Sequence, residues 1–265
     1  MDERRRPRAP GPIRWVLPVL LCALYLPLVT MVTGSFFEIE ARGGGLSLRW
    51  YREVFEDPAL WESLARSCLV AASSAFLATV VGLIGALALD KWVFAGKWPL
   101  RALSLVSLML PELVLALSLL SWYALVGLSL SLSTVVIAHV TLTLPFVILV
   151  IGARLRGLDS SYEDAARDLG ACETQVLWKV TLPLLAPSIL TAFLLAFLIS
   201  FDDFLVTFYT NGAGSDTLPV RLYSLMKTGL TPKVQALSSI MLLFSVVLIY
   251  VLVKLRGIEN ASSEA

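Results

Sequence analysis

Three carboxylate side chains lie inside or directly beside long apolar runs of the chain: Glu112, Asp202 and Asp203. A charged side chain at mid-bilayer costs at least ~2.5–3.5 kcal/mol, so such residues usually mark a path for ions or polar cargo. The apolar runs contain no lysine or arginine that could neutralise these acids. We therefore expect a cation path. The alternative is a structural role, as an ion pair with another subunit or as a solvated helix end.

Helix geometry refines the expected path. Glu112 lies about ten residues into its apolar run, roughly 15 Å along a helix and so near the middle of a bilayer. Tyr123 is expected on the same helix face, because the eleven residues between them make close to three full turns. A carboxylate beside an aromatic ring suits an alkylammonium group. Asp202 and Asp203 differ by about 100° around a helix, so only one is expected to face the path.

The composition places these residues in a membrane. Hydrophobic residues make up 57% of the 265 residues and charged residues 15%, and the mean hydropathy is +0.81. In ordinary soluble domains, hydrophobic residues make up roughly 45–50% and charged residues about 25%. A soluble globule of this size cannot bury so much apolar surface, which excludes soluble enzymes, nucleic-acid binders and disordered tails.

Cofactor chemistry is not indicated. The three cysteines, Cys22, Cys68 and Cys172, are scattered without metal-ligand spacing, and His139 is the one histidine. We expect no metal and no cofactor, with His139 as a polar contact between packed helices. The chain also lacks a GxxxxGK[ST] nucleotide-binding loop. It is therefore not expected to be an enzyme, and ATP hydrolysis must come from a partner.

Six runs are long and apolar enough to cross a bilayer, which takes roughly 17–25 residues. They predict an all-α, polytopic membrane protein with one transmembrane domain over residues 15–253. The first run is longer than a signal-peptide core and lacks an A-x-A-like cleavage site, so it is interpreted as a retained span. The long run 102–153 is expected to fold back at Gly127–Ser133. The spans are expected near 15–37, 67–89, 102–126, 134–151, 180–201 and 234–253.

Basic residues are distributed unevenly between the two sides of this six-span arrangement. One side holds the N-terminal segment 1–14, the loops after the second and fourth spans, and the tail 254–265. It carries 14 of the 21 lysines and arginines, and the other side carries 7. The positive-inside rule therefore predicts that both termini are cytoplasmic.

The cytoplasmic segment 154–183 is longer than most other connections and is patterned. Ser160 with Glu163, and Ser161 with Asp164, have the capping-box spacing that begins a helix. A short amphipathic helix is expected over Tyr162–Leu169, ended by Gly170.

A second short helix is expected over Thr174–Val180, before Pro183. Two interpretations of the helix pair stay open. It is either an amphipathic elbow resting on lipid head groups or a docking element for a soluble partner, held in place by the spans.

This segment resembles the EAA coupling motif of ABC-importer permeases, in which the pattern EAA-x3-GA is followed by Leu-Pro. Asp164 stands where the family usually has Glu, and Glu163 precedes it, so the acidic character is kept. The resemblance implies that the segment fits a groove of the ATPase subunit and transmits its closure to the spans. The matching positions are Asp164, Ala165, Ala166, Gly170, Ala171, Leu182 and Pro183.

The resemblance extends over nearly the whole chain, from about residue 15 to residue 256. The chain is similar to permease subunits of bacterial spermidine/putrescine importers, and in particular to the second, shorter permease of each pair. Pro111-Glu112 stands where that subfamily has Pro-Asp. The runs that carry the similarity are 110–120, 139–150, 200–208 and 218–237.

This second resemblance implies a type I ABC importer permease fold in the plasma (inner) membrane, with a polyamine as cargo. It implies three protein partners: an ATP-binding subunit, as a dimer, a second permease subunit and an extracytoplasmic substrate-binding protein. It favours Asp202 over Asp203 for the path. It also adds Trp50 in the outer segment, although a role as an interfacial anchor explains this residue as well.

Other functions stay open. Importers of ferric iron or aminophosphonate have related permeases, whereas unpaired carboxylates argue against an anion. A secondary transporter or channel would use the same acids but predicts internal repeats and leaves the 154–183 motif unexplained. A non-transporting membrane scaffold would tolerate neutral replacement of Glu112.

Overall fold

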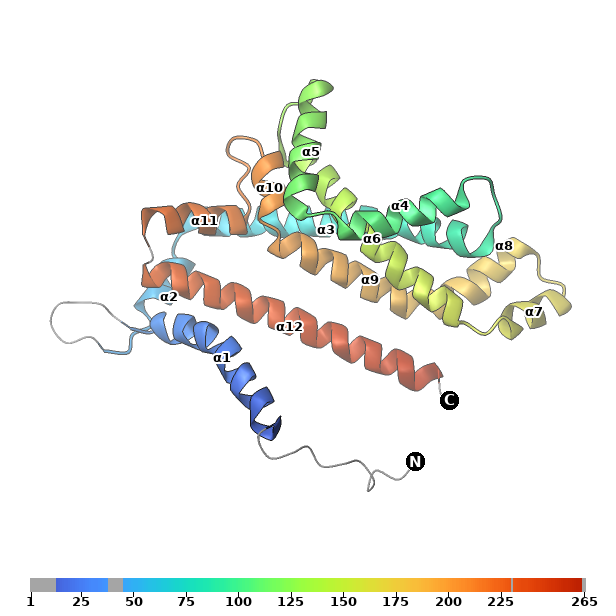
Figure 1. The fold of residues 1–265 in the computed structure, drawn as a ribbon, viewed down its shortest axis with the longest axis horizontal. Helices are drawn as coiled ribbons and strands as arrows, with labels where there is room; N and C mark the ends of the chain where they lie inside the picture. The colour runs from blue at the N-terminus through green and yellow to red at the C-terminus, as the bar shows by residue number, and fades with distance from the viewer. Residues whose placement is uncertain (1–12, 38–44, 230, 264–265) are drawn as a thin grey trace. The chain divides into compact units, whose positions relative to one another are not determined.

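The computed structural model describes residues 13–37, 45–229 and 231–263, and these are almost entirely helical (Figure 1). Residues 1–12 of the predicted N-terminal segment and residues 264–265 of the predicted tail lie outside the described residues. The chain divides into two compact units, one of residues 1–57 and 225–242 and the other of residues 58–224 and 243–265. The helices α11 (Leu218–Thr228) and α12 (Pro232–Ser263) contribute to both units.

Unit 1 contains α1 (Ile13–Gly34) and α2 (Arg49–Phe55), joined through a single β-bridge between Phe37 and Leu46. The hydroxyl groups of Ser35 and Tyr51 lie 2.7 Å apart and connect the end of α1 to α2. At the start of α12, Lys233 Nζ donates to Asp57 Oδ2 at 2.8 Å.

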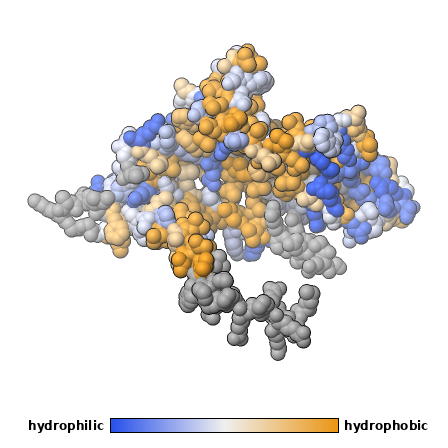
Figure 2. All heavy atoms as spheres, in the orientation of Figure 1, coloured by the Kyte–Doolittle hydropathy of each residue, from blue (hydrophilic) through white to orange (hydrophobic). Residues whose placement is uncertain are grey.

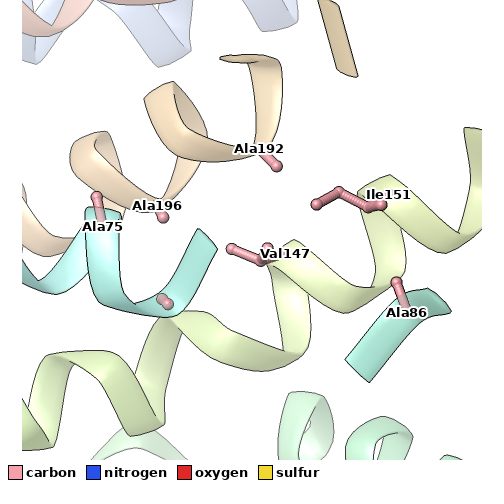
Figure 3. Close-up of a cluster of buried hydrophobic side chains, with 7 residues drawn as sticks. Ala75, Ala86, Val147, Ile151, Ala192 and Ala196 are labelled. Carbon is pink, nitrogen blue, oxygen red and sulfur yellow. The ribbon is translucent and has the colours of Figure 1, made fainter. Parts of the chain in front are cut away.

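The core of unit 2 lies where α3 (Pro58–Lys91), α6 (Leu132–Gly157) and α9 (Leu182–Asp202) run alongside one another (Figure 1). Small residues dominate this contact and let the backbones approach closely, as in other membrane-helix interfaces. A Cβ atom on Gly82 of α3 would lie 2.5 Å from a methyl carbon of Val147. Figure 3 shows the buried cluster, formed by Ala75, Ala78, Ala86, Val147, Ile151, Ala192 and Ala196.

The remaining elements of unit 2 surround this core. The helices α4 (Lys97–Met109) and α5 (Glu112–Leu125) precede α6, and α10 (Leu205–Thr210) follows α9. Between α6 and α9 lie α7 (Ser161–Asp168), α8 (Glu173–Val176) and the π-helix η2 (Leu177–Thr181). Figure 2 shows hydrophilic residues gathered over the end of unit 2 that carries α7 and α8.

The predicted count of six spans is not reproduced by the described residues. Four helical stretches are long and apolar enough to cross a bilayer: Pro58–Lys91, Leu132–Gly157, Glu173–Asp202 and Pro232–Lys254. A fifth is reached only if α4 and α5, which meet at a bend of 113°, count as one span. The apolar part of α1, Pro18–Gly34, is shorter.

The third predicted span is wrong as a continuous helix. Leu110 adopts an extended conformation (φ −66°, ψ 132°) between α4 and α5. Proline disfavours the helical conformation in the residue before it, and Pro111 follows Leu110 directly. The helix therefore stops, and α5 begins in a new direction at Glu112.

Candidate functional site

A cavity of about 360 Å³ in unit 2 brings together the three predicted acids, Glu112, Asp202 and Asp203. The rest of its lining is Ser107 and apolar side chains of the α4–α5 region, α6 and α9. No lysine or arginine is among its lining residues. This acidic cavity is the candidate functional site.

Glu112 reaches the acidic cavity from the break between α4 and α5. It is the first residue of α5 rather than about the tenth of a continuous span, so the straight helix behind the predicted depth is absent, and the depth in the bilayer stays a prediction. The break leaves its carboxyl group within hydrogen-bonding range of the Asp203 carboxyl group.

Asp202 and Asp203 both line the acidic cavity, although the helical period predicted that only one would face the path. The reason is that α9 ends at Asp202 and Asp203 is extended (φ −67°, ψ 129°), so the 100° offset of a helix does not apply. Asp202 is exposed, and its two carboxylate oxygens accept hydrogen bonds from Ser245 Oγ at 3.0 and 2.9 Å.

Asp203 is buried and caps α10. Its Oδ2 accepts hydrogen bonds from the backbone N–H and the hydroxyl of Thr207 at 2.8 and 3.0 Å. Its Oδ1 accepts one from the backbone N–H of Val206 at 3.3 Å. On the α6 side, His139 Nε2 lies 3.1 Å from Asp203 Oδ2. The prediction that His139 is a polar contact between packed helices is confirmed.

Tyr123 does not line the acidic cavity. It is fully buried, and its hydroxyl donates to the carbonyl oxygen of Thr134 at 2.9 Å. Eleven residues separate it from Glu112, about 16 Å along a helix. Because sharing a helix face does not bring the two side chains together, their predicted pairing around one ammonium group is wrong.

Trp50 lies on α2 in unit 1. Its indole N–H donates to the carbonyl oxygen of Phe37 at 3.3 Å, and the Arg49 guanidinium carbon lies 5.3 Å from the ring centroid. These contacts fit an anchoring role for the ring. A role for Trp50 on the cargo path stays a prediction.

The predicted coupling segment begins with α7, whose N-terminus differs from the expected capping box. Ser160 makes no side-chain cap, and Asp159 Oδ1 instead accepts a hydrogen bond from the backbone N–H of Ser161 at 2.9 Å. Glu163 does not complete a capping box because Lys91 and Thr181 bind its carboxylate.

Glu163 ties α7 to two other elements of unit 2. Lys91, the last residue of α3, donates to its carboxylate, and Thr181 Oγ1 of η2 donates to it at 2.7 Å. Partial burial raises the pKa of Glu163, but the hydrogen bonds from Lys91 and Thr181 outweigh this effect and hold the pKa below its ordinary value. The sequence analysis did not identify these partners, which lie 72 and 18 residues away.

The end of α3 is held to other elements as well. Asp90 accepts a hydrogen bond from Arg101 Nη2 of α4 at 2.9 Å and one from Arg156 Nη1 of α6 at 3.1 Å. Together with the pair of Lys91 and Glu163, these contacts join α3, α4, α6 and α7 at one end of unit 2.

The other acid of the motif, Asp164, is exposed and pairs with Arg167 at 2.8 Å. Ala165 is exposed, and Ala166 and Ala171 are half-buried. The predicted end of α7 at Gly170 is confirmed. Gly170 has φ +88°, and no atom lies within 4 Å of the position that a Cβ would take.

The second predicted helix of the segment does not end before Pro183, because α8 continues through η2 into α9. The backbone N–H of Leu182 bonds to the carbonyl of Leu177, five residues back. Pro183 is the second residue of α9, which follows the π-helix directly, and so lies inside the continuous helix. Leu182 is half-buried and Pro183 is exposed.

Residues 67–256 match the protein family described as binding-protein-dependent transport system inner membrane component. The spermidine/putrescine transport system permease protein PotC of Haemophilus influenzae is 40% identical over 235 residues, which cover 87% of this chain and 91% of that protein. The putrescine transport system permease protein PotI of Escherichia coli K12 is 33% identical over 240 residues, which cover 86% of this chain and 85% of that protein.

Among solved structures, a similar fold occurs in a bacterial ABC transporter involved in the import of the acidic polysaccharide alginate. The TM-score is 0.67 at 18% sequence identity, and the match covers 91% of this chain and 93% of that chain. This likeness concerns the fold and carries no information on cargo.

Proposed function

The chain belongs to the family of binding-protein-dependent transport system inner membrane components, and we propose that it carries polyamines, putrescine or spermidine, into the cytoplasm. It is a multi-pass inner-membrane permease subunit and not itself an enzyme. Relatives that are 33–40% identical over most of their length bear the names of spermidine/putrescine and putrescine permeases.

The acidic cavity is the single observation that carries the cargo proposal. Three carboxyl groups meet in it without a lysine or arginine in its lining. A polyamine supplies ammonium groups for the carboxylates and methylene groups for the apolar part of the lining. An anionic cargo would meet uncompensated negative charge there.

Replacement of Glu112 by glutamine tests the cargo site. Glu112→Gln keeps the shape of the side chain and removes its charge, so we expect a KM for putrescine raised roughly tenfold or more, since a hydrogen bond to a charged group is worth about 1.5–3 kcal/mol. The assay is uptake of labelled putrescine in cells that lack other polyamine importers. Glu62→Gln is the matched control, because Glu62 lies outside the cavity and pairs with Arg66. Wild-type uptake by the Glu112 variant at normal abundance would contradict the proposed site.

We also propose that the segment 154–183 binds an ATP-binding subunit, which would act as a dimer. The support is the exposed apolar side chains Tyr162, Leu169 and Trp178, at 58%, 90% and 70% exposure, within an otherwise hydrophilic end of unit 2. Large exposed side chains of this kind mark surfaces for contact with another protein. A second permease subunit and an extracytoplasmic substrate-binding protein would complete the importer.

A further inference from the structure

His139 is a fully buried side chain of α6, and both of its ring nitrogens have hydrogen-bonding partners. Nδ1 lies 2.6 Å from Oγ of Ser200 on α9. Nε2 lies 2.9 Å from Oγ1 of Thr207 on α10 and 3.1 Å from Oδ2 of Asp203. The ring therefore connects α6, α9 and α10 beside Asp203, which lines the acidic cavity.

The direction of these hydrogen bonds follows from their acceptors. A carboxylate only accepts, so the His139 Nε2 carries a hydrogen. In the neutral ring Nδ1 then accepts from the hydroxyl of Ser200, which accepts in turn from the hydroxyl of Ser74, 2.9 Å away. In the protonated ring both hydroxyls reverse, and Ser74 donates to the carbonyl oxygen of Ala71 at 3.3 Å. In both states Nε2–H has two acceptors within reach, Thr207 Oγ1 at 2.9 Å and Asp203 Oδ2 at 3.1 Å.

The two oxygens of Asp203 differ in how fully they are used. Oδ2 lies within reach of three donors, namely His139 and the backbone and hydroxyl groups of Thr207. Among the described hydrogen bonds Oδ1 accepts one, from the Val206 backbone at 3.3 Å, and the Glu112 carboxyl group lies within hydrogen-bonding range of the Asp203 carboxyl group. Fixing Oδ2 fixes the rotation of the carboxylate, so Oδ1 keeps accepting capacity in a residue that lines the acidic cavity beside Glu112.

We propose that His139 is a positioning residue for cargo: it holds Asp203 so that Oδ1 and the Glu112 carboxylate together accept the N–H groups of one primary ammonium. This inference rests on the proposed polyamine transport. A primary ammonium carries three N–H donors, whereas a quaternary ammonium carries none. The same carboxylate pair therefore selects a polyamine with a free terminal amine over one with a trimethylated end.

Two substitutions separate the two nitrogens of the ring. His139→Gln can keep an N–H near the position of Nε2, whereas His139→Asn reaches only the Nδ1 side, toward Ser200. We expect His139→Asn to raise the KM for putrescine roughly tenfold with little change in the maximal rate per permease molecule. His139→Gln is expected to recover most of that loss. The measurement is labelled putrescine uptake by the complete importer, corrected for the amount of permease in the membrane.

Competition by N,N,N-trimethylputrescine gives a second readout that a purely structural role would not move. Wild type is expected to discriminate strongly against it, and His139→Asn to lose much of that discrimination. Thr141→Val is the matched control on α6, since the Thr141 hydroxyl bonds only to its own helix at Ile137 among the described contacts. If His139→Asn fails to accumulate, Thr207→Val removes a different Oδ2 donor and is expected to raise the KM in the same way.

The outcomes separate this inference from the proposed function. A lower membrane abundance with unchanged KM and unchanged discrimination in the variants of His139 and Thr207 would overturn the positioning role. If Glu112→Gln also transports normally, the cargo site itself fails. If Glu112→Gln is impaired while His139→Asn keeps the wild-type KM, the cargo site stands and only the role of His139 is refuted.

Discussion

The turn between α7 and α8 depends on one backbone conformation that an L-residue adopts only at a cost. Gly170 has φ +88°, and no atom lies within 4 Å of the position of a Cβ. Gly170→Ala therefore introduces no clash, and its effect is purely conformational. The left-handed region costs an alanine roughly 1–2 kcal/mol.

This cost falls on binding when the turn of the free variant relaxes to another conformation and the partner ATPase binds only the described one. Restoring the described turn then costs roughly 1–2 kcal/mol, which lowers the association constant roughly 5- to 30-fold. Gly170→Asn is expected to lose less, because asparagine tolerates positive φ better than alanine does. The maximal uptake rate should fall in parallel with the occupancy of the ATPase on the permease.

The assay is co-purification of the ATPase subunit with the permease over a range of ATPase concentrations, together with putrescine uptake. Gly157→Ala is the matched control: Gly157 ends α6, has open space around it and has no positive φ. Wild-type association by Gly170→Ala, at equal permease abundance, would refute the claim that this turn positions the docking surface.

Three further results are expected. Because the folded-state pKa of Glu163 is lowered from its ordinary value of 4.5, its contribution to holding α7 is present above that value and is lost as the pH falls through the folded-state pKa. Amide exchange of α7 should therefore rise at acidic pH, and Glu163→Gln should abolish the pH dependence. Gly82→Ala should lower the free energy of unfolding by about 1–3 kcal/mol, because its Cβ would clash with Val147. Unfolding in detergent measures this change. Gly85→Ala on the same helix is the control and should have no such effect, since its Cβ would have its nearest contact at 3.4 Å. Reporters fused after Ala265 should be active only as cytoplasmic reporters, and periplasmic phosphatase activity there would contradict the proposed topology.

The apolar runs predicted where most helices lie but not where one of them breaks. The second, fourth and sixth predicted spans fall inside α3, α6 and α12, because length and hydropathy are local properties of the chain. Pro145 and Pro187 remain inside helices, whereas Pro111 ends one. A proline in an apolar run has the same local chemistry in each case. The residues before Pro145 and Pro187 stay helical and Leu110 before Pro111 does not, and the sequence around the three prolines does not distinguish these outcomes.

The residues of the candidate site could likewise be predicted from the sequence, but their arrangement could not. Acids in apolar runs identified Glu112, Asp202 and Asp203 as residues of interest, and all three line one cavity. The helix period then gave two wrong answers. For Asp202 and Asp203 it assumed a helix that continues past Asp202. For Tyr123 it identified a shared face of α5 but not the separation of about 16 Å from Glu112 along that helix. The contact between His139 and Asp203 is set by tertiary packing across 64 residues, for which a single sequence carries no signal.

Because α3 is long and unbroken, a small tilt at its middle produces a larger displacement at its end. The helix spans 34 residues, and none of them after Pro58 is a proline. Ser74 contacts the His139 network near its middle and Lys91 holds α7 at its end, 17 residues or about 25 Å further along. A stiff rod of that length, tilted by about 5° at Ser74, displaces its end by about 2 Å. A tilt of about 5° that leaves the hydrogen bond of Ser74 intact would therefore move the α7 end of α3 by about 2 Å.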